Sequence, residues 1–532
     1  AFSATVDLAY AITFIEVVAT DAAGNTQRVT RAVERSTAFF AMSEPTMATD
    51  GAVDAVVLML GQAAVDDGDH DEAVDDDLAA AFRTVLRTVR LGTLLPSPLL
   101  GFACEGGDCA LIPIAFTTTD RDVTLTLKDG KIGVQITLDA PSLQLVLLAP
   151  CRTNTCSVDP VALAGSVTAA SITITADLVI HLDDGAPTAT AEGVVISVGG
   201  QTIAFDDPDT QASAAVGTAM TALTDGLEGV LAPVWSSLIE GQMTGLMDGL
   251  LQALAYDLVF ELPPVVEGTE PTNLVIETRP SAVDITPERI RIVLDGLAFS
   301  QSPLRPAQSL GSIDRVGCAP KADMAFTAAD PLAIGLHDDL LNQLLFAVWE
   351  GGTLDLDLGP TETAPLVDGT GITDMALRIE MRLPPVFNTC RADGAVLQVS
   401  EMFVDATFKL VGEPASFALW LQTEAPVSVE LGVNDKGASN GALVLGDLAP
   451  FTVEFIRNTG FFDGNEQALI ELLRNELVPL VLATAIKTAR FDLPNLALGE
   501  IAEGLPSDTV IDLNVETVGR DGGYLTLKGR LN

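Results

Sequence analysis

The residues of this chain that could do covalent chemistry are few and poorly placed for it. The pentapeptide 437–441, Gly-Ala-Ser-Asn-Gly, matches the G-x-S-x-G pattern of serine hydrolases. A nucleophile elbow needs a strand before the serine and a helix after it, whereas this pentapeptide lies in a predicted polar turn between strands. All three histidines, His70, His181 and His337, precede Ser439. Because H-E-x-x-H, Walker and dinucleotide-binding patterns are also absent, we predict a non-enzymatic protein without a cofactor.

Six cysteines form the second reactive group. Two pairs are close in sequence, Cys104 with Cys109 and Cys151 with Cys156, and the distant Cys318 and Cys390 complete the even count. Both close pairs lie in polar or glycine-rich segments, so we predict disulfides and an extracellular, cell-surface or periplasmic location. The sequence does not determine which cysteines are bonded to each other. Zinc is the weaker alternative because no C-x-x-C occurs, and we predict no metal at these residues.

An acidic segment, Asp66 to Glu72, alternates carboxylates as calcium loops do. Glu72 stands where an EF-hand needs glycine, and Leu78 stands where it needs a bidentate glutamate. The favoured interpretation is a solvated connection in which residues 75–77 stabilise the N-terminus of the next helix. Calcium binding remains the alternative.

The composition excludes several classes of partner. With 28 Lys plus Arg against 73 Asp plus Glu, the formal charge is -45, which disfavours nucleic acid and anionic membrane surfaces. Hydrophobic residues make up 48% of the chain and aromatic residues only 5%, so the interior should be aliphatic, a lining that suits acyl chains. The longest apolar run, Leu477 to Ile486, is too short to span a bilayer. The start at Ala1 has no signal-peptide pattern, which is typical of a mature product or a fragment.

Hydrophobic periodicity predicts an α+β chain whose first half begins with a β-hairpin at 1–45. Helical spacing follows at Val53, Val56, Val57 and Leu60, and again over 78–89. Strands are expected over 111–205, with a two-residue turn at Asp129-Gly130. A long helix is predicted from about 211 to 258, bent at Pro233. The predicted strands of this region are 123–127, 132–138, 167–182 and 189–205.

The second half repeats this order after a boundary at 262–271. Strands at 273–299 and near Met324 precede a helix at about 331–349. A second helix is expected at 465–487. The remaining predicted strands are 375–383, 395–411, 416–433, 441–455, 510–518 and 524–531. The order helix, sheet and helix therefore occurs twice.

A curved sheet with one apolar face needs a cover, and a long helix is the available one. The glycines at 241, 245 and 249 have no side chains, so a ligand could approach the backbone of the first helix and complete the packing there. Ordinary core packing is the alternative. The leucines that we predict to contact lipid in the first groove are Leu223, Leu227, Leu231, Leu238, Leu246 and Leu250. Those for the second groove are Leu341, Leu345, Leu469, Leu473, Leu477 and Leu480.

Three segments resemble known families. Ile15 to Thr26 is similar to the last strands of bacterial immunoglobulin-like repeats. Asp330-Pro331 through Trp349 to Leu354, together with the ending from Leu469, resembles the tubular lipid-binding superfamily, which includes bactericidal/permeability-increasing protein and the lipopolysaccharide-binding proteins. The resemblance implies a boomerang of two long-helix-in-curved-sheet domains joined by a central sheet. Its expected divisions are 1–45, an immunoglobulin-like remnant; 46–265, a first barrel; 266–320, a central sheet; and 321–532, a second barrel.

Two functions follow as hypotheses. The first is non-catalytic binding or transport of lipids or other apolar ligands, in a chain that could be joined to upstream immunoglobulin-like domains or a surface assembly. The N-terminal half has no basic cluster, so apolar chains are expected as ligands in preference to phosphorylated endotoxin. The alternative is a structural or adhesive module that uses the same fold without lipid transfer.

Overall fold

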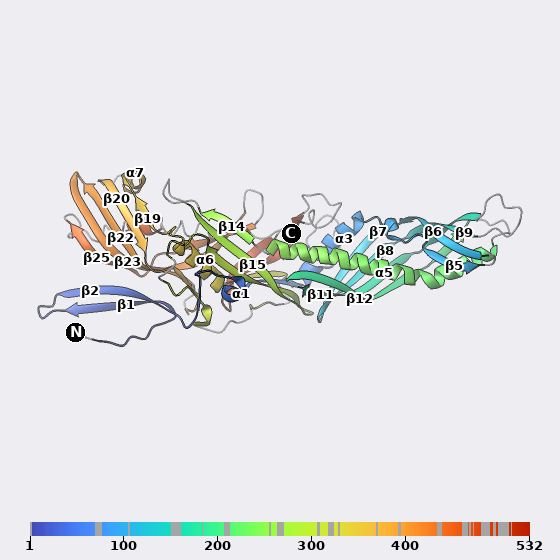
Figure 1. The fold of residues 1–532 in the computed structure, drawn as a ribbon, viewed down its shortest axis with the longest axis horizontal. Helices are drawn as coiled ribbons and strands as arrows, with labels where there is room; N and C mark the ends of the chain where they lie inside the picture. Colours follow the sequence, from blue (N-terminus) through green and yellow to red (C-terminus); the bar gives the residue numbers. More distant parts are fainter. Residues whose placement is uncertain are drawn as a thin grey trace.

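A computed structural model defines the fold. It describes residues 3–69, 77–104, 107–149, 161–183, 185–206, 213–254, 257–262, 271–305, 309–317, 324–327, 330–368, 371–391, 395–433, 439–459, 467, 470–471, 473–479, 490–492, 496–497, 510–511 and 513–531. The molecule is elongated, with the long helix α5 (Ser213–Leu254) running along one half and a curled sheet at the opposite end (Figure 1). It is a mixed α+β structure in which strands predominate, as the sequence predicted.

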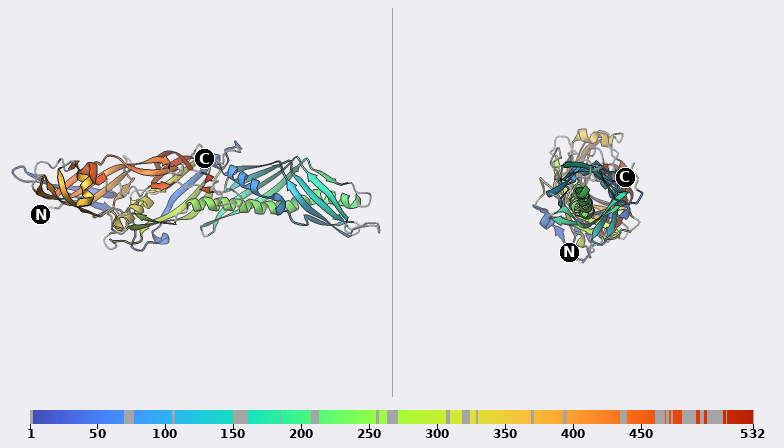
Figure 2. Two further views of the ribbon diagram at one scale, coloured as in Figure 1. Left: turned by 90° about the horizontal axis from the view of Figure 1, so that it is seen from above. Right: turned by 90° about the vertical axis from the view of Figure 1, so that its right-hand side faces the viewer.

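Two sheets build the half of the molecule that contains α5. One has the order β13 (Thr202–Phe205), β10 (Val161–Thr168), β9 (Ser142–Ala149), β6 (Gly107–Thr117), β5 (Leu100–Cys104). The other has the order β12 (Ala186–Gly199), β11 (Ser171–Asp183), β8 (Lys131–Asp139), β7 (Asp120–Lys128). Seen end-on, these strands curl into a ring with α5 (Figure 2). The predicted turn between β7 and β8 is confirmed, with Gly130 at φ 74°.

A central sheet joins strands that are far apart in the sequence. Its order is β14 (Asp257–Leu262), β15 (Thr272–Ile285), β16 (Arg289–Ser300), β4 (Ala52–Gly61), β18 (Leu332–His337), β30 (Tyr524–Leu531), β29 (Leu513–Asp521). The helix predicted from Val53, Val56, Val57 and Leu60 is therefore wrong, because these residues form β4. Val56 to Leu60 are at most 4% exposed and face both sides of the sheet. A doubly buried strand is apolar at every position and so mimics helical spacing.

The opposite half is one long, curled sheet. Its main path is β19 (Leu356–Leu358), β20 (Ile372–Met381), β22 (Val396–Leu410), β23 (Glu413–Val433), β24 (Ser439–Leu445), β26 (Arg490–Asp492); β21 (Val386–Asn388) pairs with β22, and β25 (Phe451–Thr459) with β23. Short pairs are β17 (Ser312–Ile313) with β3 (Phe39–Phe40), and β27 (Leu496–Ala497) with β28 (Val510–Ile511). The strand expected over 441–455 is two strands, interrupted before Phe451.

The remaining helices are short. They are α1 (Met47–Asp50), α2 (Gln62–Val65), α3 (Leu78–Thr88), α4 (Leu91–Leu94), α6 (Asp338–Glu350), α7 (Pro360–Thr363), the 3-10 turns η1 (Arg315–Gly317) and η2 (Ala364–Val367), and the π-helical turn η3 (Leu473–Leu477). The helix predicted from residue 331 begins later, at Asp338, because β18 occupies the preceding residues. Met324 is buried but lies outside any strand. Most of the helix predicted at 465–487 lies outside the described residues.

The acidic segment is organised by hydrogen bonds to its carboxylates. Asp77 caps α3, since its side chain accepts a hydrogen bond from the Ala80 amide at 2.6 Å. Asp66 accepts one from the Leu125 amide at 2.7 Å. Burial raises the pKa of Asp77 to about 6. The capping role predicted for residues 75–77 is confirmed at Asp77, and residues 70–76 lie outside the described chain.

The N-terminal hairpin consists of β1 (Ala11–Thr20) and β2 (Thr26–Arg35), as predicted. Side chains of the curled sheet hold its base. Gln398 accepts from the Ile12 amide at 3.1 Å and donates to the Ile12 carbonyl at 3.0 Å. Glu401 accepts from the Ala32 amide at 2.7 Å. Because buried polar side chains bind backbone groups, the hairpin is fixed to the sheet without joining it.

Candidate functional site

Helix α5 fills the gap between two sheet edges. It contacts β12, the edge of one sheet, and β5, the edge of the other. Glu240 accepts a hydrogen bond from the Ala191 amide at 2.9 Å, and the Thr244 hydroxyl accepts one from the Ala189 amide at 3.1 Å. These polar side chains cover the unpaired edge of β12, which an exposed sheet would otherwise leave open to pairing.

The inner face of α5 carries three of the predicted lipid contacts. Leu223 is 0% exposed, Leu231 5% and Leu238 9%, and all three belong to the core that also includes β6, β9 and β11. The structure therefore brings them together against the sheets. The side chains of Leu227, Leu246 and Leu250 lie outside those that the structure describes. Contact of any of these leucines with lipid stays a prediction.

One stripe along α5, from Gly229 to Gly241, is exposed and uncharged. Gly229, Pro233, Ser237 and Gly241 recur every four residues and are exposed. A helix that is apolar around its circumference is normally covered on all sides. The helix contains no Lys or Arg, so this bare stripe lacks the long cationic side chains that commonly cover helix surfaces.

A groove of about 450 Å³ lies beside this stripe and reaches the buried Leu238. It is lined by Leu94, Pro233, Val234, Ser237, Leu238 and Gly241. Leu94, at the end of α4, is 38% exposed and forms the opposite wall. No heavy atom lies within 4 Å of the position that a Cβ at Gly241 would occupy. Leu238 was predicted from the sequence, whereas Leu94 and Pro233 carry no signal that would have placed them at one site.

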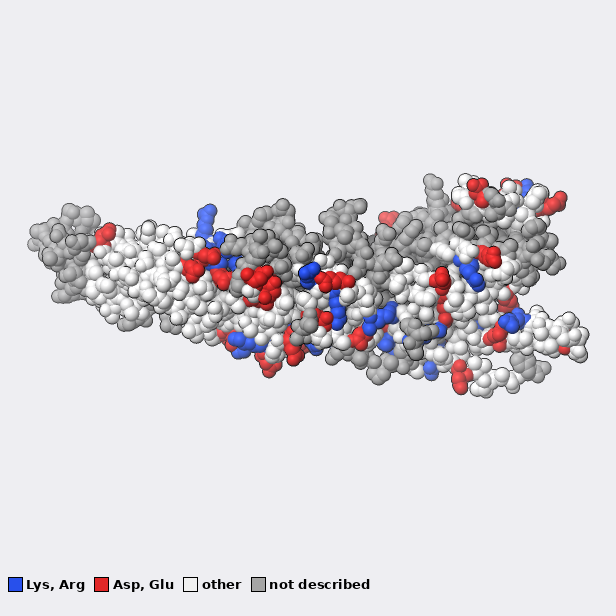
Figure 3. Space-filling model, turned by 180° about the vertical axis from the view of Figure 1, so that it is seen from behind, with Lys and Arg blue, Asp and Glu red and all other residues white. Residues whose placement is uncertain are grey.

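The six residues that line the groove carry no charged side chain. The surrounding part of the chain is acidic, because between Lys131 and Arg279 the sequence contains one Lys or Arg, Arg152, and 18 Asp plus Glu. Figure 3 shows the side of the molecule opposite to the view in Figure 1, and on that side the end built from β5, β6 and β9 has almost no charge, although the whole chain carries -45. Such an uncharged lining offers no ion pair to a charged ligand. Covering it with an apolar ligand has a small desolvation cost, because no charged group is buried.

The second predicted groove is only partly described. Leu345 and Leu473 belong to the same core beneath the curled sheet; Leu473 is 1% exposed and Leu345 is half-buried. Leu341 is half-buried on α6. Leu469, Leu480 and the side chain of Leu477 lie outside the described part of the chain.

A larger cleft, of about 1030 Å³, lies at the end of α6 and is ionic. Its arginines are neutralised locally: Arg305 pairs with Asp355, and Arg378 and Arg382 both approach Glu380, at 3.4 and 3.7 Å. The Arg305 guanidinium also lies 5.0 Å from the centre of the Trp349 ring. Sequence reasoning did not identify this cleft, because its charged residues come from separate segments.

The structure does not form a nucleophile elbow at Ser439. Ser439 is the first residue of β24, and the chain continues as a strand to Leu445. Within the described residues no group of histidine, cysteine and carboxylate side chains could hold a metal ion. Among the helices of the described chain, none is long and apolar enough to cross a membrane.

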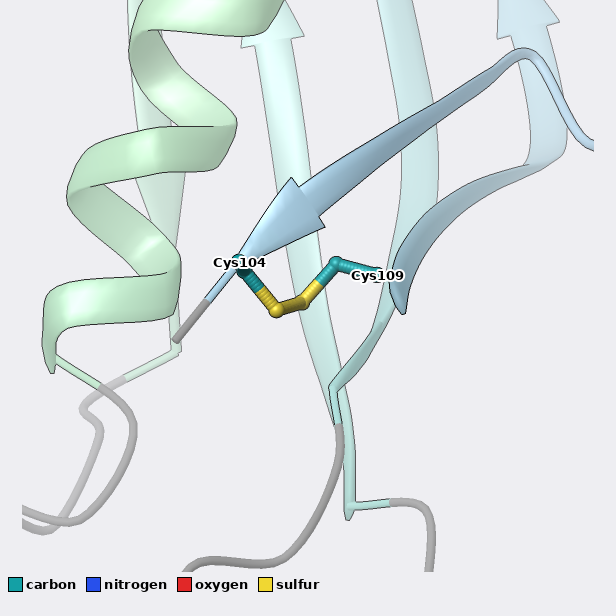
Figure 4. Close-up of a disulfide and its surroundings, with 2 residues drawn as sticks. All are labelled: Cys104 and Cys109. Carbon is teal, nitrogen blue, oxygen red and sulfur yellow. A yellow bond between two sulfur atoms is a disulfide. The ribbon is translucent and has the colours of Figure 1, made fainter. Parts of the chain in front are cut away.

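The prediction of disulfides is confirmed at Cys104 and Cys109, whose pairing the sequence left open. Cys104 and Cys109 are bonded across the β5–β6 hairpin, with Cα atoms 5.8 Å apart (Figure 4). Cys390 is also in a disulfide. Cys151, Cys156 and Cys318 lie outside the described residues. In general, structural disulfides persist mainly in oxidising compartments.

Comparisons with known proteins found structural likeness only. No family model matches the sequence, and no curated protein matches it. Among solved structures, the crystal structure of lipopolysaccharide binding protein is 14% identical, with a TM-score of 0.44, and the match covers 90% of this chain and 99% of that one. The crystal structure of P47 of Clostridium botulinum E1 is 7% identical, with a TM-score of 0.25, over 91% of this chain and 100% of that one.

Proposed function

We propose that this protein binds apolar ligands, lipids in particular, against helix α5, outside the cytoplasm and without catalysing a reaction. The observation that carries the proposal is the groove between Leu94 and the stripe from Pro233 to Gly241. Its volume of about 450 Å³ is in the range of small-molecule sites. Its lining offers one hydroxyl, on Ser237, and no charge.

The physical driving force is burial of an aliphatic chain. Each methylene removed from water contributes about 0.8 kcal/mol, so a chain of about ten methylenes gives several kcal/mol without an ionic contact. The part of the stripe from Pro233 to Gly241 runs along the groove, and an extended chain would cover this part lengthwise. Because the lining itself is uncharged, the affinity should come from the apolar chain and not from an ionic contact.

The same proposal extends to the organisation of the chain. We assign residues 46–265 and 321–532 to two barrels of the tubular lipid-binding type and residues 1–45 to an immunoglobulin-like remnant. The core that contains Leu345 and Leu473 would correspond, in the second barrel, to the core beneath α5 in the first. It would hold a second apolar ligand.

A bulky side chain at position 241 tests the groove directly. Gly241→Trp should place an indole in the groove and weaken binding of a fluorescent long-chain fatty acid at least about tenfold, or about 1.4 kcal/mol. Gly229→Trp is the matched control, because Gly229 is exposed on the same stripe, has no heavy atom within 4 Å of the position that a Cβ would occupy, and does not line the groove. Fluorescence titration of both purified variants measures the difference.

Both substitutions replace a helical glycine, so neither should unfold α5. Equal affinity of the fatty acid for wild type, Gly241→Trp and Gly229→Trp would show that the groove is not the binding site. Absence of binding to the wild type would contradict the proposed function itself.

A further inference from the structure

The distal half of the N-terminal hairpin has an unpaired strand edge. In the register of β1 and β2, Glu16 lies opposite Thr30 and Phe14 opposite Ala32. The amides of Thr30 and Ala32 bond to Glu454 and Glu401 of the curled sheet, so they point away from β1. In an antiparallel pair the residues opposite them also direct their backbone groups outward.

The outward residues of β1 are therefore Ile12, Phe14, Glu16, Val18 and Thr20. Gln398 binds both backbone groups of Ile12. Within the described chain, the backbone groups of Phe14, Glu16 and Val18 have no such partner on that edge. The segment before β1 contributes one contact, from the Ala9 amide to the Thr13 hydroxyl at 3.1 Å.

This edge lacks the usual protection against pairing. Proteins protect edges with proline, lysine, bulges or a covering element. Residues 13–20, Thr-Phe-Ile-Glu-Val-Val-Ala-Thr, contain no proline and no lysine, and the β1–β2 register is continuous. Val17 and Val18 are 37% and 49% exposed. The one charge, on Glu16, is paired with Arg28 at 2.7 Å.

The hairpin is also held in a position that presents this edge. Its base is fixed by Gln398, Glu401 and Gln422, which donates to the Thr30 carbonyl at 3.1 Å. Residues 16–28 are exposed throughout. In Figure 1 the hairpin lies beside β23 and β25, and its turn is directed to the end of the molecule. A fixed base reduces the entropy lost when a further strand is added.

We propose that the outer edge of β1, from Phe14 to Thr20, is a strand-addition site for an extended segment of another polypeptide. Main-chain hydrogen bonds would supply the affinity, as in β-augmentation. The partner strand should be free of proline and carry neutral or basic side chains, because this chain has a charge of -45. The same charge opposes pairing with a second copy. The proposal is independent of the lipid groove.

A labelled synthetic peptide with the sequence of β2, Thr26–Arg35, is a suitable probe, since it contains three arginines and no proline and already forms a strand beside β1. The full protein should bind it, and residue-resolved hydrogen exchange should show new protection at Phe14, Glu16 and Val18. Fluorescence anisotropy of the peptide gives the affinity.

Val18→Pro removes one outward amide while leaving the inner edge intact, a substitution that edge strands tolerate. It should weaken peptide binding at least about tenfold (about 1.4 kcal/mol). Unchanged protection at Val17 and Val29 would show that the hairpin is still folded. Thr13→Ser, near the fixed base, is the control and should bind like the wild type.

Three results would overturn the proposal: no new protection at Glu16 and Val18 at millimolar peptide, equal binding by wild type and Val18→Pro, or full protection of these amides in the free monomer. Analytical ultracentrifugation tests the remaining alternative. If the wild type is a dimer and Val18→Pro is a monomer, the partner of this edge is a second copy of the chain and the stated partner is refuted.

Discussion

Replacing Arg315 with methionine should lower the free energy of unfolding by about 3–5 kcal/mol, because it leaves a buried carboxylate without its cation. The Arg315 guanidinium lies 2.5 Å from the Asp338 carboxylate, and their side chains are 12% and 3% exposed. The same guanidinium and the same carboxylate both bond to the Thr389 hydroxyl. The Arg315 amide donates to Asp339 at 2.7 Å.

The cluster joins η1, the start of α6 and the residue after β21. Its loss should therefore destabilise the contacts among these three segments. Burial raises the pKa of Asp338, and Arg315 opposes that rise. The loss in Arg315→Met should therefore shrink at low pH, where Asp338 takes up a proton. Urea unfolding at several pH values, followed by circular dichroism, measures both effects.

Arg28→Met is the matched control. The side chains of the Arg28–Glu16 pair are 66% and 44% exposed, so this pair should contribute almost nothing to the free energy of unfolding. Adding Asp338→Asn to Arg315→Met should recover part of the loss, since the uncompensated charge is then removed. Similar losses in Arg315→Met and Arg28→Met would contradict the ion-pair explanation.

Glu350→Gln should stabilise the protein at pH 8 and have little effect near pH 4. Glu350 is the last residue of α6 and is 4% exposed, and burial raises its pKa to about 7. The folded state therefore binds more protons than the unfolded state between about pH 4.5 and 7, so stability from this group falls as pH rises through that window. The negative charge is also unfavourable at a helix C-terminus.

The expected gain is at most about 3.5 kcal/mol well above pH 7, at about 1.4 kcal/mol for each pKa unit. The difference in the free energy of unfolding between wild type and Glu350→Gln separates the effect of this residue from that of other carboxyls with raised pKa values, such as Asp77. Chemical unfolding at pH 4, 6 and 8 provides the comparison. A difference that is constant with pH, or that grows toward low pH, would refute the buried-carboxyl interpretation.

Local signals in the sequence were sufficient for elements whose pattern is set by near neighbours. Asp129-Gly130 marked a two-residue turn, and the alternation around it gave β7 and β8. The length of α5 followed from its leucine spacing, and Pro233 lies within it. These features depend on residues within one hairpin or one helix, so the sequence carries them directly.

Features that depend on distant pairing could not be predicted. Residues 52–61 look helical alone and become β4 because β16 and β18 flank them. Leu94 and Gly241 line one groove although α4 and α5 are far apart in the sequence, so no local pattern links them. The hydrogen bonds from Gln398 and Glu401 to the backbone of the hairpin could not be predicted from neighbouring residues, since single polar residues in strands are common on exposed faces. Leu223, Leu231 and Leu238 lie in the core beneath α5, but contact of the predicted leucines with a ligand stays a prediction.

Mass spectrometry of the intact, natively purified protein tests lipid binding most directly. We predict a population heavier than the polypeptide by the mass of one or more apolar molecules, which denaturation releases and which Gly241→Trp reduces. Repeated preparations whose native mass equals that of the chain alone, with no lipid in the organic extract, would contradict the account.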